Sequence, residues 1–233
     1  MAPTKSQVLD IARKAIDIFA KHGLKCCLTG GVASQLYGVS RTPSDVDLVV
    51  LTKSYGQETL KEILAIADSR FYLVPSKTMF ATYKVLWYRL TEGSYAYTKT
   101  HIRALYDCKV DILVPEGDMN IPDVPHARIT TRSGLPLMPL IPQLLLKLQA
   151  WSDHRAATQS HLRMKQYVDV RDIDALLAIA VREGARAEDA RKEDDGWLAG
   201  SAFRVAEARL SSFIWYGSPA SASLWRKLGF TVA

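Results

Sequence analysis

Two aspartates near residue 46 have the residue type and spacing that metal chemistry requires. Asp45 and Asp47 open the run DVDLVVL, which alternates and then becomes apolar, as expected of a strand buried on at least one face. Residues two apart on a strand point to the same side, so the two carboxylates project together. Neighbouring carboxylates repel each other unless a cation lies between them, and hard cations prefer oxygen ligands. The pair therefore indicates a site for a hard metal ion.

A glycine pair upstream has features of a phosphate-binding turn. Gly30 and Gly31 follow a short strand expected at residues 25–29 and precede a short helix expected at residues 32–37. Glycines let the backbone approach a phosphate closely, and the start of the following helix offers free N–H groups to an anion. Ser34 can hydrogen-bond a phosphate from the first turn of this helix or satisfy its own backbone, and the sequence leaves both open. Neither the glycine pair nor the aspartate pair is specific alone, but the two with a helix between them form a fairly specific pattern.

The whole segment 28–50, LTGGVASQLYGVSRTPSDVDLVV, resembles the signature of the DNA polymerase β-like nucleotidyltransferase superfamily, in which Gly-Gly or Gly-Ser precedes Asp-x-Asp. Thirteen residues separate Gly31 from Asp45, at the long end of the familiar range. Arg41 and Thr42 resemble part of the R-T/S-x-D-x-D form of small-molecule and toxin-type members. The resemblance implies that Asp45 and Asp47 bind Mg²⁺. It also implies that Gly30, Gly31, Ser34 and Arg41 bind the phosphates of a nucleoside triphosphate such as ATP.

The superfamily pattern requires a third carboxylate on a neighbouring strand, and Asp111 supplies it. Asp111 lies between Val110 and Ile112 in the run CKVDILVP, residues 108–115, which has the pattern of a buried strand. A buried carboxylate is unfavourable unless it is paired or binds metal. The alternative is an aspartate satisfied by Lys109 or by the backbone. The upstream motif favours the interpretation of Asp111 as a catalytic metal ligand.

The second half of the chain, over residues 144–177, resembles the helical half of the AbiEii-like branch of this superfamily. Lys147 stands alone among leucines, and the resemblance implies that its ammonium neutralises the triphosphate. The alternative is a surface lysine whose stem lies along apolar neighbours. Asp169 and Asp172 either orient Lys147 or Lys165, or cap the next helix.

The expected architecture is α/β (α+β), with an N-terminal catalytic lobe over residues 1–135 and a helical lobe over residues 136–233. In the first lobe a mixed sheet of the nucleotidyltransferase type is combined with helices, and the boundary is expected to hold within about ten residues. Six of the ten prolines lie in residues 115–142, which predicts an irregular crossover with little helix. Helices are expected at 5–22, 57–67, 144–151, 169–182, 197–216 and 220–228, and further strands at 71–74, 83–90, 102–106 and 109–114. The charged residues 184–196 are either a solvated loop or a short helix.

Composition sets limits on the remaining function classes. The chain has 233 residues, is 48% hydrophobic and carries a net charge of +6, which is ordinary globular composition. No stretch of about 18 uncharged apolar residues predicts a membrane helix. Three cysteines without CxxC spacing suggest buried free thiols and a cytoplasmic protein. The positive charge is compatible with a nucleotide or RNA partner, although a solvated basic surface explains it equally well.

The expected reaction is Mg²⁺-dependent transfer of a nucleoside monophosphate from an NTP to an acceptor hydroxyl, with release of pyrophosphate. The AbiEii-like resemblance implies an RNA end such as tRNA as the acceptor, and a basic stretch in the helical lobe agrees with it. Antibiotic-modifying members imply a small hydroxylated molecule instead, and a third possibility is an inactive relative that binds a nucleotide or RNA. The aromatic cluster is expected to pack rather than to stack a base, and the histidines are assigned to the surface or to packing. The basic stretch comprises His154, Arg155, His161, Arg163, Lys165 and Arg171; the aromatic cluster Tyr83, Trp87, Tyr88, Tyr95 and Tyr97; and the histidines His22, His101, His126, His154 and His161.

Overall fold

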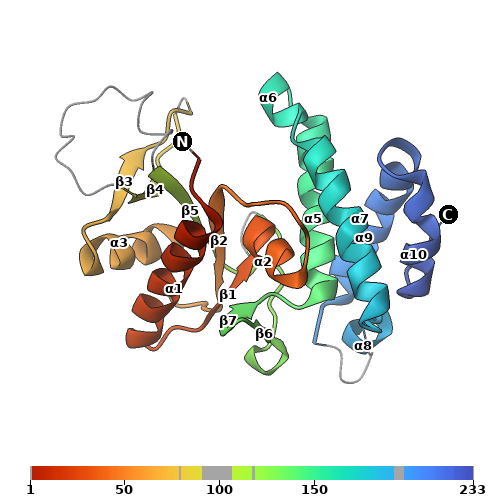
Figure 1. Cartoon of the computed structure of the whole chain (residues 1–233), viewed down its shortest axis with the longest axis horizontal. Coiled ribbons are helices and arrows are strands. Elements are labelled where there is room, and N and C mark those ends of the chain that lie inside the picture. The colour runs from red at the N-terminus through yellow and green to blue at the C-terminus, as the bar shows by residue number, and fades with distance from the viewer. Residues whose placement is uncertain (1, 79, 91–106, 117–118, 192–196, 233) are drawn as a thin grey trace. The chain divides into compact units, whose positions relative to one another are not determined.

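The computed structural model describes residues 2–78, 80–90, 107–116, 119–191 and 197–232, and the chain divides into two compact units (Figure 1). Unit 1 consists of Met1–Gln35, Thr42–Ile121 and Thr131–Leu137. Unit 2 consists of Leu36–Arg41, Pro122–Thr130 and Met138–Ala233. Each unit is described by itself below.

Unit 1 is built on a mixed sheet whose described strands run in the order β3-β4-β5-β2-β1-β7-β6. β2 is parallel to β5 and antiparallel to β1, while β4 is antiparallel to both β3 and β5. The strands are β1 Cys26–Thr29, β2 Asp45–Val50, β3 Phe71–Pro75, β4 Lys84–Arg89, β5 Asp107–Leu113, β6 Thr130–Arg132 and β7 Leu135–Leu137. The expected mixed sheet with helices is confirmed.

Residue alternation gives the central strands two different faces. Val46 of β2 lies opposite Val110 of β5, which lies opposite Leu86 of β4, and all three side chains are buried. The residues one position away point to the other side because successive side chains on a strand alternate. Asp45 and Lys109 therefore share the second face. The apolar face is buried, and the other face carries charged side chains.

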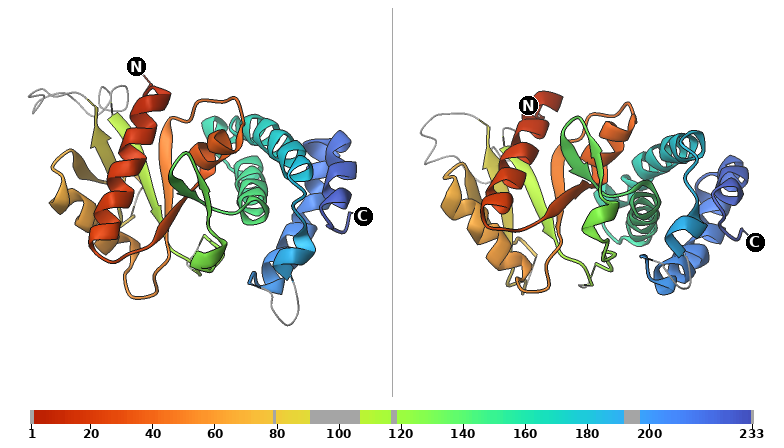
Figure 2. Two further views of the ribbon diagram at one scale, coloured as in Figure 1. Left: turned by 60° about the horizontal axis from the view of Figure 1, so that its bottom comes forward. Right: turned by 90° about the horizontal axis from the view of Figure 1, so that it is seen from below.

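Two helices of unit 1, α1 (Lys5–Lys21) and α3 (Gln57–Ala67), pack against the sheet and against each other (Figure 2). α1 begins at a capping box, in which the Thr4 hydroxyl accepts from the Gln7 backbone N–H and the Gln7 side chain accepts from the Thr4 N–H. The predicted apolar residues recur at helical spacing; Val8, Ala12, Ala15 and Phe19 are buried, while Leu9 and Ile16 are half-buried. α3 has the predicted bounds. The third helix, α2, spans Gly30–Tyr37.

Unit 2 is helical, as predicted for the second half of the chain. Aromatic side chains form its core, where Trp151 meets Phe213 edge-on at 5.0 Å between ring centroids and Trp225 meets Phe230 at 5.1 Å. Its described helices are α5 Leu140–Ala156, α6 Ser160–Arg163, α7 Gln166–Arg182, α8 Ala187–Arg191, α9 Gly200–Tyr216 and α10 Ala222–Lys227, with 3₁₀ turns η1 His126–Arg128 and η2 Pro219–Ser221.

The region around residues 115–142 differs from the prediction. It contains the short strands β6 and β7, and β7 pairs with β1 through Leu28 and Leu137. α5 begins at Leu140, four residues before the expected start, because Pro142 lies in the first turn, where its missing N–H has no helical partner to lose. α7 likewise begins three residues early.

Side chains of the aromatic and cysteine groups lie in several environments. Tyr88 is buried and packs edge-on against Phe71 at 4.7 Å, as the packing interpretation predicted, whereas Tyr83 is 48% exposed. The three cysteines are buried free thiols, as expected.

The strand expected at residues 102–106 falls outside the described residues, together with Tyr95, Tyr97 and His101. No helix in the described part of the chain is both long and apolar enough to cross a membrane.

Candidate active site

The junction of β1 and α2 brings a backbone turn against an aspartate. α2 begins at Gly30, directly after β1, two residues earlier than the sequence indicated. Gly30 has a φ of +59°, and a Cβ at this position would lie 1.9 Å from Oδ2 of Asp47. Only glycine combines this backbone conformation with so close a neighbour. The Asp47 carboxylate therefore lies directly against the start of α2.

The residues of α2 that were expected to bind phosphate differ in their hydrogen bonding. Gly30 and Gly31 are the first two residues of the helix, so their N–H groups are among those without an intrahelical acceptor. Ser34 is buried, and its hydroxyl donates to the Gly30 carbonyl at 2.8 Å. Of the two roles that the sequence left open for Ser34, the structure contains the backbone hydrogen bond, which holds the Gly30 turn in place.

The third predicted carboxylate lies beside the first two. In the parallel pair of β2 and β5, Asp47 lies opposite Asp111 and Asp45 lies opposite Lys109. Adjacent strands are separated by about 4.8 Å, and all four residues are on the same face by alternation. Sequence reasoning placed Asp111 on a neighbouring strand, and the pairing of β2 with β5 brings it next to Asp47.

Lys109 lies on the same face and is the partner of Asp111. Its Nζ lies 2.6 Å from Asp111 Oδ2, and the two side chains are 40% and 33% exposed. Burial alone would lower the pKa of Lys109, but the charge of Asp111 and its hydrogen bond, with smaller contributions from Asp47 and Asp45, raise it above its ordinary value. Lys109 is therefore a permanent cation among the three carboxylates.

The donor set of this face suits Mg²⁺, because three carboxylates on facing strands offer hard oxygen ligands. Glycine at position 30 lets the Asp47 carboxylate lie close to the start of α2. Among the described residues, no three His, Cys, Asp or Glu side chains are already gathered closely enough to hold a metal ion. Asp111 is bound to Lys109 instead. The three carboxylates suit Mg²⁺ in residue type, and the register of β2 and β5 places them on one face. In this structure the Asp111 carboxylate is paired with the Lys109 ammonium.

Cys108 is next to these carboxylates in the chain but points to the buried face of the sheet. Burial raises its pKa to about 12, and the nearby charges of Asp45 and Asp47 act in the same direction. A buried thiol whose pKa is raised in this way is a poor nucleophile at neutral pH. The chemistry of this face therefore belongs to carboxylates.

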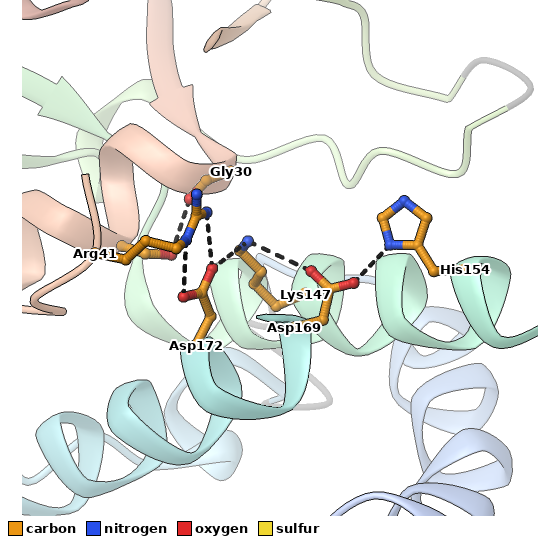
Figure 3. Close-up of polar contacts among 7 residues, drawn as sticks. Gly30, Arg41, Lys147, His154, Asp169 and Asp172 are labelled. Atoms are coloured by element: carbon orange, nitrogen blue, oxygen red, sulfur yellow. Dashed lines mark hydrogen bonds and ion pairs between the residues drawn. The ribbon is translucent and has the colours of Figure 1, made fainter. Parts of the chain in front are cut away.

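In unit 2 a second group of charges connects Arg41 with α5 and α7 (Figure 3). Arg41 donates to both carboxylate oxygens of Asp172, at 3.2 and 3.0 Å. Lys147 Nζ donates to Asp172 Oδ2 at 2.8 Å and lies 3.7 Å from Asp169 Oδ1. The other oxygen of Asp169 lies 2.6 Å from His154 Nδ1. These five side chains are called the charge network below.

Most of the charge network is removed from solvent. Lys147 is 7% exposed and Asp172 1%, so the surface-lysine interpretation of Lys147 is wrong. The capping interpretation of the aspartates is also wrong, because both lie inside α7, and both contact Lys147. Burial alone would raise the pKa of Asp172, but the hydrogen bond from Arg41 and the charge of Lys147 hold it below its ordinary value.

Sequence reasoning missed the part played by His154. It was assigned to the surface or to packing, whereas its ring contacts a buried carboxylate. A signal was present: His154 follows Lys147 by seven residues, which is two helical turns, so both lie on one face of α5. Asp169 and Asp172, three residues apart on α7, likewise share a face.

Part of the basic stretch proposed for RNA has structural partners. Arg163 donates to the carbonyls of Ala157 and Thr158 at 3.1 and 2.7 Å, just after the end of α5. The guanidinium of Arg155 lies 3.9 Å from the centroid of the Tyr216 ring. Lys165 and Arg171 are exposed at the start of α7. These last two are the members best suited to bind a large anion.

No protein-family model and no curated protein matches the sequence. Among solved structures, an antigenic nucleotidyltransferase-like protein from Paracoccidioides brasiliensis is similar to this chain with a TM-score of 0.62. The comparison covers 99% of this chain and 97% of that one at 12% identity. The chain therefore has a nucleotidyltransferase-type fold. A solution structure of the antibiotic-resistance factor ANT(2'')-Ia is also matched, over 78% of this chain and 94% of that one, with 14% identity and a TM-score of 0.40.

The nucleotidyltransferase-type fold confirms the architecture that the resemblance of residues 28–50 implied. At this level of identity the likeness concerns the fold alone, so activity has to be argued from the residues themselves. The residues of unit 1 that carry this argument are the three carboxylates, Lys109 and the glycine turn.

Proposed function

We propose that the protein is a Mg²⁺-dependent nucleotidyltransferase that moves a nucleoside monophosphate from an NTP to an acceptor hydroxyl. The observation that carries the proposal is the pairing of Asp47 with Asp111 across β2 and β5, with the Asp47 carboxylate against Gly30. A bond forms between the acceptor oxygen and the α-phosphorus as the bond to pyrophosphate breaks. When bound, Mg²⁺ supplies positive charge at the entering and leaving oxygens of such a displacement.

Within unit 1, Asp45 and Asp47 would hold Mg²⁺ with the triphosphate. Gly30 and Gly31 would offer backbone N–H groups of the first turn of α2 to the phosphates, while Ser34 keeps the Gly30 carbonyl in place. Asp111 would complete the metal site on the acceptor side and help to deprotonate the attacking hydroxyl.

Arg41 and Lys147 are proposed to neutralise the triphosphate of the bound NTP, for which ATP is one candidate. Their shared contact with Asp172 supports this role, because a carboxylate that holds two cations fixes where their positive charges are presented. The Arg41 side chain is 34% exposed, whereas that of Asp172 is 2% exposed. Asp172 is then a positioning residue.

Nucleotide binding tests the metal site directly. Asp47→Asn should abolish Mg²⁺-dependent binding of ATP, measured by titration calorimetry, and leave the circular dichroism spectrum unchanged. Asp10→Asn is the matched control, since it removes the same charge from an exposed pair with Arg13 on α1. Equal ATP affinity in wild type and Asp47→Asn would exclude the proposed site.

Asp111 should matter more for transfer than for nucleotide binding, because its proposed place is on the acceptor side. Asp111→Asn is expected to keep most ATP affinity and to lose transfer, measured with labelled NTPs, Mg²⁺ and total RNA. A parallel fall of binding and turnover by one factor would contradict this division of roles, as would no change in either.

The acceptor is proposed to be RNA. The net charge of +6 and the exposed Lys165 and Arg171 support it, since phosphate contacts on such residues release counterions. RNA affinity should therefore fall steeply with salt, by roughly one log-log unit per contact. Lys165→Glu with Arg171→Glu should weaken RNA binding and leave ATP binding unchanged. The same reversal at Arg226 and Lys227 of α10 is the control.

Wild-type protein that shows no salt-sensitive RNA binding near ~0.1 M salt would reject RNA. A small hydroxylated acceptor would then be tested by transfer assays with hydroxylated compounds in place of RNA. Failure of the RNA arm leaves the ATP titration with Asp47→Asn unaffected, so the acceptor and the nucleotide site are tested separately.

A further inference from the structure

Lys109 has no role in the reaction proposed above. It lies on the carboxylate face of unit 1, opposite Asp45 in the register of β2 and β5 and two residues before Asp111 on its own strand. Its ammonium is 2.6 Å from the Asp111 carboxylate. The same carboxylate is the third ligand that Mg²⁺ would need. Lys109 and a bound Mg²⁺ would therefore compete for the Asp111 carboxylate.

The charges on this face leave room for a further cation. Asp45, Asp47 and Asp111 carry three negative charges and Lys109 one positive charge, so these four neighbouring residues have an excess of two negative charges. A divalent ion would neutralise that excess. Since Lys109 and the ion carry charge of the same sign a few ångströms apart, they repel each other whenever both are present.

We propose that Lys109 is an exchangeable counter-ion: it holds Asp111 in the metal-free protein, and metal binding takes Asp111 from it. The proposal rests on the metal site proposed above and adds a residue that sets the affinity of that site. Lys109 thereby limits metal binding in the absence of a nucleotide, whose phosphates supply the negative charge needed to favour the exchange.

The character of the ion pair supports exchange rather than permanent pairing. Lys109 is 40% exposed and Asp111 33%, so both can be solvated once separated. A lysine ammonium is a point charge on a flexible stem, which can move away without losing a fixed two-point geometry. The pair of Arg41 with Asp172 is the opposite case, since two hydrogen bonds join a guanidinium to a carboxylate that is almost fully buried.

Metal titration without a nucleotide tests the proposal. Lys109→Met should tighten Mg²⁺ binding, measured by calorimetry with MgCl₂ alone, by roughly tenfold, because a competing positive charge has been removed. Lys109→Gln serves as a second neutral variant should the methionine variant fold poorly. Lys109→Arg keeps the charge and should bind Mg²⁺ within about threefold of wild type. Lys84→Met, which removes an exposed lysine 3.7 Å from Glu62, should leave Mg²⁺ affinity unchanged.

A double mutant separates competition for Asp111 from a general change of charge. In an Asp111→Asn background, the tightening caused by Lys109→Met should fall to less than threefold, because the contested carboxylate is gone. Undiminished tightening in that background, or no tightening in the neutral Lys109 variants, would overturn the proposal. If wild type and Asp47→Asn bind Mg²⁺ and ATP equally, the proposed function fails first and takes this inference with it. Normal ATP binding through Asp47 with an inert Lys109 refutes the inference alone.

Discussion

Charged side chains are gathered on the sheet face of unit 1 and, separately, between α5 and α7 of unit 2. On the sheet, three carboxylates meet one ammonium, and the Lys109–Asp111 pair is more than one-third exposed at the lysine. In the charge network two carboxylates meet Arg41 and Lys147, and Asp172 is almost fully buried. The first group has more negative than positive charges and is partly exposed, which agrees with the proposed cation site. The second pairs two buried carboxylates with two cations, which agrees with a group that holds these cations in place.

Burial decides how much each group contributes to stability. A buried ion pair is costly to break because the remaining partner is left unpaired in a low-dielectric surrounding. A solvent-exposed pair contributes little, since water replaces the lost partner. Mutations in the buried charge network should therefore lower stability more than mutations of the partly exposed Lys109–Asp111 pair.

The largest effect is expected at Asp172. Asp172→Asn leaves Arg41 and Lys147 without their shared carboxylate and should lower the free energy of unfolding by about 3–5 kcal/mol. Asp174→Asn, two residues further along α7, is the control. Burial raises the pKa of Asp174, whose carboxylate accepts from Ser218, so a neutral side chain is tolerated there and the change should stay within about 0.5 kcal/mol. Urea denaturation measures both, and equal losses would contradict the difference in environment.

A comparison of two lysines sharpens the contrast between the units. Lys147→Met should cost roughly 2–3 kcal/mol, less than Asp172→Asn because Asp172 keeps Arg41 and Asp169 keeps His154. Lys109→Met should cost less than about 1 kcal/mol, since its ion pair is partly exposed. The two variants remove the same charge, so their unfolding curves at one pH and salt concentration can be compared directly. A larger loss at Lys109 would contradict the greater contribution of the buried ion pair to stability.

Gly30 is the position in unit 1 where geometry rather than charge should matter. Gly30→Ala places a Cβ against the Asp47 carboxylate and keeps a positive φ, so it should cost about 2–3 kcal/mol and weaken Mg²⁺·ATP binding at least about tenfold. Gly23→Ala has a similar φ of +72° but no atom within 4 Å of the new Cβ. It should cost about 1 kcal/mol and leave ATP binding unchanged. Equal ATP affinity in both variants would show that the close approach of Asp47 has no part in binding.

The sequence predicted the local features of this site because they depend on neighbours in the chain. The two-residue period placed Asp45 and Asp47 on one side of β2, and the helical period gave α1 and α3 nearly or fully correct bounds. The short strands β6 and β7 were missed because three-residue strands among prolines have too few residues to show a period.

Features that depend on distant pairing could not be read from the sequence. The pairing of β2 with β5, which brings Asp111 next to Asp47, joins residues 64 positions apart in the chain. Lys109 is only two residues from Asp111 and was one of the alternative partners, but the sequence alone did not decide between it and a metal ion. The charge network requires α5 to pack against α7, and periodicity within one helix does not say which helix faces it. Lys147, Asp172 and His154 each had a defined face, but the contacts between those faces are long-range.

The smallest effect is expected at His154, at the end of the charge network. His154→Phe removes the hydrogen bond to Asp169 Oδ2, while Oδ1 keeps Lys147 at 3.7 Å, and the ring's 25% exposure lets water approach. The cost should be about 1 kcal/mol, well below that at Asp172. His161→Phe, an exposed position on α6, is the control and should change stability by less than about 0.5 kcal/mol. A loss of unfolding free energy at His154 as large as at Asp172 would contradict this ranking and show that the network contributes to stability as one unit. No loss would show that the contact of His154 with Asp169 does not contribute to stability.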